Sequence, residues 1–342
     1  MSERLEDIAK AMVAPGQGIL AADESNSTMQ KRFDTIGAEN TEANRRAYRE
    51  MLFTSDDAMS NYISGVILFD ETIHQKCEDG TRFVDKIKAQ GAVPGIKVDE
   101  GVKDLDGCPG ETVTQGLDGL ADRLKGYYEE GARFAKWRAV ITITDTLPTA
   151  KGIQANAEAL AKYAKACQEA GIVPIVEPEV QGDADPADHS LERCEEVTAE
   201  VLRVTFEELA KHDVNLAGIV LKPSMVLPGR NAPKADPKDV AAATLRVLKA
   251  TVPAEVPGIA FLSGGQSDRE ATKHLSLMNE MGGGPWTLTF SYGRALQDPP
   301  RAAWKGDKAN LPAAAKAFLH RAKMNGLAAK GEYRDEMEDE AA

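Results

Sequence analysis

Short runs of apolar residues recur along the chain, and longer segments with helical periodicity separate them. Each run is rich in Ile, Val, Leu or Phe and spans only a few residues, which is typical of a strand covered on both faces. The runs lie at 18–23, 64–70, 94–99, 134–140, 174–179, 217–223, 258–265 and 287–294. Eight strands alternating with helices predict an α/β fold, a single (β/α)8 TIM barrel. An open doubly wound sheet is the alternative, but no GxGxxG sequence follows the first run.

Apolar residues repeat every three or four positions in the segments between these runs, which predicts helices. Ser267 and Glu270 have the spacing of a capping box and mark one helix start. Gly131 and Gly171 follow two other periodic segments, as expected of helix C-caps. The predicted helices lie at 117–131, 160–171, 191–202, 267–278 and 311–328.

The two ends of the chain depart from the barrel repeat. The first residues predict an amphipathic helix whose apolar face carries Leu5, Ile8, Met12 and Val13. The last twelve residues contain six carboxylates, a composition typical of a solvated and mobile segment. We therefore expect one barrel domain over residues 1–330 and a flexible acidic tail over 331–342.

Composition narrows the classes of function. The formal net charge is -13, which disfavours binding to nucleic acids and to anionic membrane surfaces. No run of 18 apolar residues predicts a membrane span, and the N-terminus resembles neither a signal nor a transit peptide. Four scattered cysteines without a CxxC pair are typical of reduced thiols, so we expect a cytoplasmic protein. The five histidines lack ligand spacing, so neither a metal nor another cofactor is expected.

Charged residues close several of the apolar runs. In (β/α)8 barrels the carboxyl ends of the strands meet at one mouth, where the active site lies. Five such charges at one mouth are harder to explain as surface residues than a single one would be. The residues at these ends are Asp23, Lys97, Lys136, Glu177, Lys222, Ser263 and Ser291.

Two strands carry paired charges at two-residue spacing. Lys136 and Arg138 lie on one strand, and Glu177 and Glu179 on the next. This spacing puts each pair on one face, so we expect all four to point into the barrel as an ion network. For Arg138 and Glu179 we favour a structural ion pair within the barrel.

Lys222 is the candidate nucleophile. It follows Gly218-Ile-Val-Leu, so its stem is expected in apolar surroundings. Desolvation and a nearby Lys136 would both favour the neutral, nucleophilic amine. The alternative is a lysine that reaches the rim or pairs with a carboxylate.

Glycine-bearing loops after the last two strands indicate anion binding. The segments 263–267 and 291–294 combine hydroxyls, exposed backbone N–H groups and Arg294 ahead of helices, although ordinary tight turns have similar sequences. A second set of hydroxyl and basic residues comes from the first and third strands, namely Ser25, Thr28, Arg32 and Lys97. Two anion sites across one mouth would fit a bisphosphate.

Long motifs in a fixed order resemble one known family. They are ILAADES, SGVILF, GIKVD, QGLDGL, FAKWR, GIVPIVEPE, VLKPSM, FLSGGQS and TFSYGRALQ, and the resemblance spans about residues 13 to 333. Together they resemble class I fructose-bisphosphate aldolases. That resemblance implies reversible cleavage of fructose 1,6-bisphosphate to dihydroxyacetone phosphate and glyceraldehyde 3-phosphate through a lysine Schiff base, in glycolysis and gluconeogenesis.

The resemblance also implies roles for single residues. Lys222 is similar to the family's Schiff-base lysine, and Glu177 to the acid/base that helps dehydrate the carbinolamine. Asp23 resembles the base that takes the C4 hydroxyl proton, and Lys136 the lysine that orients substrate. The expected substrate contacts are Ser25, Thr28, Arg32, Lys97, Arg138, Ser263, Gly264, Ser291, Gly293 and Arg294. Relatives are commonly homotetramers, so a homo-oligomer is expected.

The chain departs from the family at two places. Members often have DESTGS where this chain has residues 23–28 as DESNST, which alters the distal phosphate loop. Members also carry a C-terminal tyrosine that assists enamine protonation, whereas Tyr333 is the only tyrosine in the acidic segment here. Open alternatives are a preference for fructose 1-phosphate or sedoheptulose 1,7-bisphosphate, a transaldolase-like enzyme, and a non-catalytic phosphosugar-binding or scaffold protein.

Overall fold

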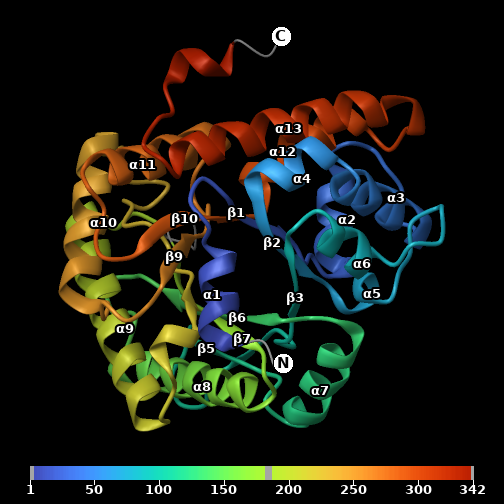
Figure 1. Ribbon diagram of the computed structural model, residues 1–342. Helices are drawn as coiled ribbons and strands as arrows, with labels where there is room; N and C mark the ends of the chain where they lie inside the picture. Colours follow the sequence, from blue (N-terminus) through green and yellow to red (C-terminus); the bar gives the residue numbers. More distant parts are fainter. Residues whose placement is uncertain (1–3, 182–186, 340–342) are drawn as a thin grey trace.

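A closed barrel of parallel strands forms the centre of the computed structural model, which describes residues 4–181 and 187–339 (Figure 1). The strands run in the order β1-β10-β9-β8-β7-β6-β3-β2 around the barrel. They are β1 (Gly18–Ala22), β2 (Ile63–Leu68), β3 (Val93–Lys97), β6 (Phe134–Thr142), β7 (Val173–Gln181), β8 (Val220–Leu221), β9 (Gly258–Phe261) and β10 (Thr287–Tyr292). All eight apolar runs therefore form strands, and the predicted (β/α)8 barrel is confirmed.

Alternate side chains of each strand fill the barrel interior or face the helices. On β6, Phe134 belongs to the interior cluster, whereas Ala135 and Trp137 belong to the layer between strands and helices. Trp137 stacks on Tyr163 of α8 (Ala150–Glu169), with ring centroids 5.4 Å apart. The alternation inferred from the spacing of Lys136 and Arg138 is thus the one that the backbone adopts.

The N-terminal helix α1 (Leu5–Met12) closes the amino-terminal end of the barrel, and it lies in front of the strands in Figure 1. Its residues Ile8 and Met12 join the interior cluster with Phe134 and the facing strand residues. The Ser64 hydroxyl donates a hydrogen bond of 2.5 Å to the Met12 carbonyl oxygen, which ties the helix to β2. Apolar burial therefore fixes this end, since each buried side chain of this size contributes about 1.5–3 kcal/mol.

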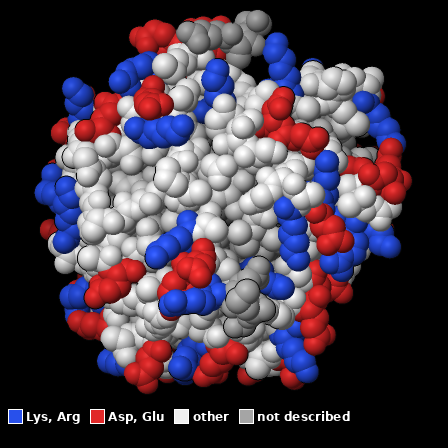
Figure 2. Space-filling view, in the orientation of Figure 1, with Lys and Arg blue, Asp and Glu red and all other residues white. Residues whose placement is uncertain are grey.

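Helices cover the outside of the barrel. Besides α1 and α8 they are α2 (Asn26–Asp34), α3 (Glu42–Phe53), α4 (Asp56–Tyr62), α5 (Asp70–Ile73), α6 (Phe83–Ala89), α7 (Leu120–Glu130), α9 (Leu191–Lys211), α10 (Pro237–Thr251), α11 (Asp268–Glu280), α12 (Arg294–Trp304) and α13 (Leu311–Ala328), with short 3-10 turns at Leu216–Gly218, Lys308–Asn310 and Asp335–Glu338. The capping box of Ser267 and Glu270 forms at the start of α11, as predicted. On the face shown in Figure 2, positive and negative side chains intermingle around a largely uncharged centre.

A short antiparallel hairpin was not foreseen from the sequence. It consists of β4 (Val102–Asp104) and β5 (Thr112–Thr114) and follows β3. Its strands are only three residues long, and β4 is fully exposed, so no apolar alternation marks them.

The acidic C-terminal segment makes contacts that its composition did not predict. Most residues of 331–339 are exposed, but Tyr333 and Glu338 are buried, and residues 340–342 lie outside the described part of the chain. Tyr333 is only 3% exposed, and its hydroxyl donates to Glu338. Glu338 in turn receives hydrogen bonds of 2.6 Å from the buried Arg321 of α13. Burial would raise the pKa of Glu338, but the bonds from Arg321 outweigh it and hold the pKa below its usual value. The acidic segment therefore contains one buried contact, between Tyr333, Glu338 and Arg321, that its composition did not indicate.

Candidate active site

A cleft of about 940 Å³ opens at the carboxyl ends of the strands, opposite α1. Every residue that the sequence singled out as a candidate lines this cleft. They are Asp23, Ser25, Thr28, Arg32, Lys97, Lys136, Arg138, Glu177, Lys222, Ser263, Gly264, Ser291, Gly293 and Arg294. Strand ends far apart in the sequence thus converge on one concave site, as expected of a (β/α)8 barrel.

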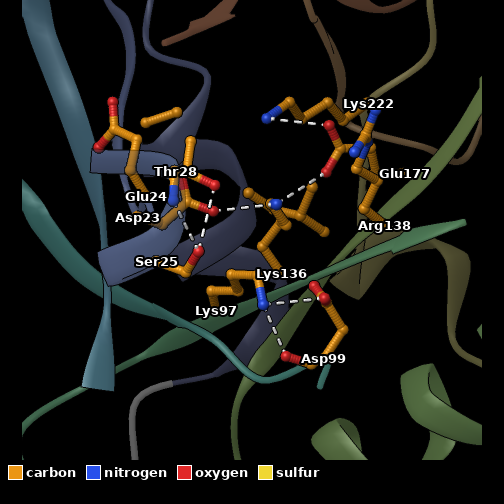
Figure 3. A network of polar contacts seen from close by, with 12 residues as sticks. Asp23, Glu24, Ser25, Thr28, Lys97, Asp99, Lys136, Arg138, Glu177 and Lys222 are labelled. Atoms are coloured by element: carbon orange, nitrogen blue, oxygen red, sulfur yellow. Dashed lines mark hydrogen bonds and ion pairs between the residues drawn. The ribbon is translucent and has the colours of Figure 1, made fainter. Parts of the chain in front are cut away.

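Four of these residues form a continuous chain of opposite charges (Figure 3). Lys222 Nζ lies 3.2 Å from Glu177 Oε1, and Glu177 Oε2 lies 3.4 Å from Lys136 Nζ. Lys136 Nζ also lies 2.9 Å from Asp23 Oδ2. The side chains of Lys222 and Glu177 are each 4% exposed, so solvent screens this part of the chain very little.

The register of the barrel explains why these side chains meet. On β6, Lys136 lies opposite Ile175 and Arg138 opposite Glu177 of β7. The Lys222 N–H donates to the Val176 carbonyl at 2.8 Å, which sets Lys222 directly after β8 and beside β7. The side chains that point into the barrel from β6, β7 and the end of β8 therefore change from apolar to charged at the same height along the barrel axis.

Burial and charge act in opposite directions on the central groups. Burial by itself would raise the pKa of Asp23, but the Lys136 ammonium, together with Lys222 and Lys97, lowers it. Burial would likewise lower the pKa of Lys136, but Asp23 and Glu177 raise it well above its usual value. Asp23 is thus an anion and Lys136 a cation at neutral pH.

Glu177 is placed between two amines and can exchange protons with either. Its Oε2 atom is buried and accepts no hydrogen bond from any residue in the described ranges 4–181 and 187–339, although Lys136 lies 3.4 Å away. A carboxyl group within reach of an amine and of a reacting oxygen has the position of a general acid/base. Lys136 is held as a cation by Asp23 as well as by Glu177, whereas Lys222, 3.2 Å from Glu177, is an amine next to a base and so has the position of a nucleophile.

Arg138 and Glu179 form the close ion pair that the sequence favoured. Burial would raise the pKa of Glu179, but Arg138 lowers it. A Cβ atom at Gly264 would lie 3.3 Å from Glu179 Oε1 and 3.0 Å from Leu262 Cδ1, so a glycine fits this position. The pair therefore supports the loop that follows β9 and also lines the cleft.

The loops after β9 and β10 bring polar groups to one side of the cleft. Ser263 precedes a turn in which Gly265 adopts φ +74°, and the turn leads into the N-terminus of α11. The hydroxyl of Ser291 is buried without a hydrogen-bond partner among the described residues. Gly293 is the N-cap of α12, and Arg294 begins that helix. The two helix N-termini and the Ser291 hydroxyl together form a site suited to an anion.

A second polar group lies on the side of β1 and β3. The Ser25 hydroxyl accepts from the Thr28 N–H at 3.3 Å and lies 3.1 Å from the Thr28 hydroxyl, which fixes both at the start of α2. Lys97 Nζ lies 2.9 Å from Asp99 Oδ1. Arg32 also lines the cleft, and burial, followed by the charge of Arg294, lowers its pKa.

Sequence reasoning missed several cleft residues, among them Glu24, Asp99, Glu100, Arg123 and Tyr127. Asp99 follows Lys97 at the two-residue spacing that had already identified Arg138 and Glu179, and that signal could have found it. Arg123 and Tyr127 come from α7 and carry no strand-end signal. Tyr333, the tyrosine of the acidic segment, does not line the cleft.

Three further features of the described ranges concern metal binding, membrane spans and the cysteines. No group of three or more His, Cys, Asp or Glu side chains there is arranged to hold a metal ion. None of the helices in these ranges is long and apolar enough to cross a bilayer. The four cysteines are all buried and unpaired.

The fold and the site together are those of a (β/α)8 barrel with a buried chain of lysines and carboxylates at its mouth. Comparison with known proteins identifies the family. The family described as "Fructose-bisphosphate aldolase class-I" matches residues 4–342. "Fructose-bisphosphate aldolase C" of Rattus norvegicus is 52% identical over 97% of this chain and 91% of its own length. "Probable fructose-bisphosphate aldolase class 1" of Xanthomonas campestris pv. campestris is 53% identical over 97% of this chain and 99% of its own length.

A solved structure agrees with these matches. Fructose-bisphosphate aldolase from Plasmodium falciparum, in complex with TRAP and a small-molecule inhibitor, superimposes with a TM-score of 0.94. It is 46% identical, and the match covers 96% of this chain and 95% of that one. This chain therefore belongs to the class-I fructose-bisphosphate aldolase family, whose members are carbon–carbon lyases.

Proposed function

We propose that this chain cleaves fructose 1,6-bisphosphate, and reforms it, through a Schiff base on Lys222. The observation that carries the proposal is the buried chain Lys222–Glu177–Lys136–Asp23, with 2.9–3.4 Å between successive charged atoms. Lys222 Nζ attacks the C2 ketone, and the resulting iminium accepts the electrons of the C3–C4 bond as it breaks. Glyceraldehyde 3-phosphate leaves, and the enamine is protonated and hydrolysed to dihydroxyacetone phosphate.

The neighbouring groups divide the proton transfers. Glu177, next to Lys222, takes the proton from the attacking amine and returns one to the departing C2 hydroxyl. Asp23 is held as an anion by Lys136, so it can accept the C4 hydroxyl proton during cleavage. Lys136 stays cationic and stabilises the negative charge that develops near Asp23 and Glu177.

The two polar ends of the cleft would hold the two phosphates. Ser263, Gly264, Ser291, Gly293 and Arg294 surround the ketone-side phosphate, with Arg32 and Arg138 nearby. Ser25, Thr28 and Lys97 bind the distal phosphate on the other side of Lys136. This division is supported by the unpaired Ser291 hydroxyl and by the two helix N-termini on one side, and by the Lys97 ammonium on the other.

Location and assembly belong to the same proposal. Buried, unpaired cysteines agree with a reducing compartment, so we place the protein in the cytosol, where it would act in glycolysis and gluconeogenesis. We also propose a homo-oligomer, a tetramer as in relatives of the family. Light scattering coupled to size-exclusion chromatography tests the assembly directly, and a monomer at micromolar concentration would contradict it.

Steady-state cleavage of fructose 1,6-bisphosphate with EDTA present tests the activity. Formation of dihydroxyacetone phosphate is followed by coupled NADH oxidation. We expect turnover that EDTA does not change, because the iminium itself serves as the electron sink. Absence of turnover by a folded protein, or turnover that EDTA abolishes and zinc restores, would contradict the proposal.

A further inference from the structure

Asp99 lines the cleft but has no role in the mechanism proposed above. It lies two residues beyond Lys97, where β3 has ended, and its side chain is only 6% exposed. Figure 3 shows both of its contacts with Lys97, apart from the chain of Lys222, Glu177, Lys136 and Asp23. Lys97 Nζ lies 2.9 Å from Asp99 Oδ1 and donates a hydrogen bond of 2.6 Å to the Asp99 main-chain oxygen. One residue therefore occupies two of the three donors of the ammonium.

The carboxylate of Asp99 is an anion in a cleft that has to bind anions. Its Oδ2 atom is buried and accepts no hydrogen bond from the residues in the described part of the chain. Its charge also reaches the central cations. Burial would lower the pKa of Lys136, and Asp99 is one of the three carboxylates that raise it instead. Asp99 Oδ1 also accepts a hydrogen bond of 3.4 Å from the Gly101 N–H, but Lys97 is the cation that the carboxylate contacts. Burying a carboxylate is costly unless its partners or a role compensate for the lost hydration.

A distal phosphate that binds Lys97 meets this carboxylate. The phosphate can use the third donor of the ammonium, or it can displace Asp99 from the other two. In either case a dianion and a carboxylate share one cation at close range, and their mutual repulsion opposes binding. When the phosphate leaves, Asp99 is already in place as the counter-ion of Lys97, so departure does not leave a half-buried ammonium without a partner.

We propose that Asp99 is a specificity-determining residue that competes with the distal phosphate of the substrate for Lys97. It weakens the affinity for bisphosphorylated ketoses and favours release of the phosphorylated aldehyde. It does not alter the affinity for ketoses phosphorylated only next to the ketone. The inference rests on the proposed aldolase activity and on Lys97 as the distal phosphate ligand.

The opposite role would be a clamp that holds Lys97 ready for the phosphate. The two roles predict opposite changes. Loss of a competitor lowers the KM for a bisphosphate, whereas loss of a clamp raises it. Fructose 1-phosphate lacks the distal phosphate, so it reports any general damage to the site in the same protein sample.

The decisive variant is Asp99→Asn, because asparagine keeps the shape and one oxygen acceptor while removing the charge. We expect the KM for fructose 1,6-bisphosphate to fall about three- to tenfold, as removal of one like charge at this range predicts. The KM for fructose 1-phosphate should stay within roughly twofold, since no distal phosphate meets residue 99. Inorganic phosphate, used as a competitive inhibitor, should bind more tightly to the variant.

Two controls sharpen the result. Glu100→Gln removes a neighbouring carboxylate of the same cleft, which is 58% exposed and lies 3.7 Å from Arg123 instead of Lys97. It should change the ratio of the two KM values by far less than Asp99→Asn. In a Lys97→Met background, Asp99→Asn should no longer lower the KM for the bisphosphate, because the shared cation is gone.

The outcomes separate this inference from the activity on which it rests. A wild-type protein that cleaves neither ketose would refute the proposed function. If the wild type cleaves both, an increased or unchanged KM for the bisphosphate in Asp99→Asn would overturn the competitor role. An equal effect of Glu100→Gln would overturn it too. Should Asp99→Asn fail to fold, Asp99→Ser removes the same charge with a smaller side chain and is measured in its place.

Discussion

The two ends of the barrel interior are built by the same strands from opposite kinds of side chain. On β6, Phe134 fills the end that α1 closes, and Lys136, two residues further along, belongs to the open end. The closed end is packed so tightly that a Cβ at Gly95 would lie 2.3 Å from the Phe134 ring. The open end holds charges in a cleft of about 940 Å³.

The contrast shows how the fold tolerates buried ions. Charges in a dry site are costly unless each finds a partner at a fixed distance. The apolar end and the helices around it keep the strand register, and the register holds Lys222, Glu177 and Lys136 within ion-pair distance. Stability thus resides mainly at one end and chemistry at the other, and variants at the two ends should separate the two properties.

The largest effect is expected for Lys222→Ala at the open end. Loss of the nucleophile should lower kcat by roughly 10⁴-fold or more, because the neighbouring amine, Lys136, is held as a cation by Asp23 and Glu177 and cannot replace it. The thermal unfolding midpoint should change little, since the remaining charges can still pair. Lys316→Ala, at an exposed position of α13, is the matched control and should keep full activity. Undiminished cleavage by Lys222→Ala would remove this residue from the mechanism.

Glu177→Gln should have the next largest effect. Glutamine fills the same space but cannot transfer the proton between amine and carbinolamine, so kcat should fall by about 10²- to 10³-fold. Rapid-quench borohydride trapping measures how fast the iminium forms. We expect slow formation with a normal final yield. A normal rate of iminium formation would assign the proton transfer to another group.

Met12→Ala at the closed end should act on stability instead. Met12 is fully buried in the interior cluster, so its truncation should reduce the free energy of unfolding by about 2–5 kcal/mol. Urea denaturation measures this, with Lys10→Ala on the exposed face of α1 as control. The ratio kcat/KM of the folded variant should stay within roughly twofold, because packing around α1 does not touch the cleft. A large loss of kcat/KM would show that the two ends are not independent.

The smallest effect concerns pH and Asp23. Because Lys136 lowers the folded-state pKa of Asp23, its ionisation stabilises the fold above the ordinary aspartate pKa of about 3.9. That contribution should be lost as pH falls below about 4 and through the lowered folded-state value. Asp23→Asn should therefore be less stable than the wild type at pH 7, by about 1–3 kcal/mol. The difference should shrink as the pH is lowered toward 3 in urea titrations. A pH-independent difference would show that the Asp23–Lys136 pair does not stabilise the fold.

The sequence was enough to predict the barrel because its strands are buried on both faces and read as continuous apolar runs. The same regularity identified the site, since charged residues such as Lys136 and Lys222 interrupt an apolar pattern at a known end of the barrel. The hairpin β4–β5 could not be predicted, because its strands are only three residues long and carry no such pattern.

Contacts between residues far apart in the sequence were the second feature that could not be predicted from the sequence. Nothing in the acidic composition of 331–339 shows that Glu338 meets Arg321, so this buried contact was not predicted. The two-residue spacing of Lys97 and Asp99 was likewise visible in the sequence. The ion pair between them, however, depends on the conformation of the loop that follows β3, which the spacing does not give. Composition describes the local preference of a segment, whereas contacts between distant residues are known only from the three-dimensional structure.

Borohydride reduction in the presence of dihydroxyacetone phosphate, followed by peptide mass mapping, tests the central claim most directly. EDTA is present throughout, and Lys222→Ala serves as the parallel sample. The account predicts one reduced adduct, on the peptide that carries Lys222, and none in the variant. An adduct on another lysine, or no adduct on a folded protein that binds the ligand, would contradict it.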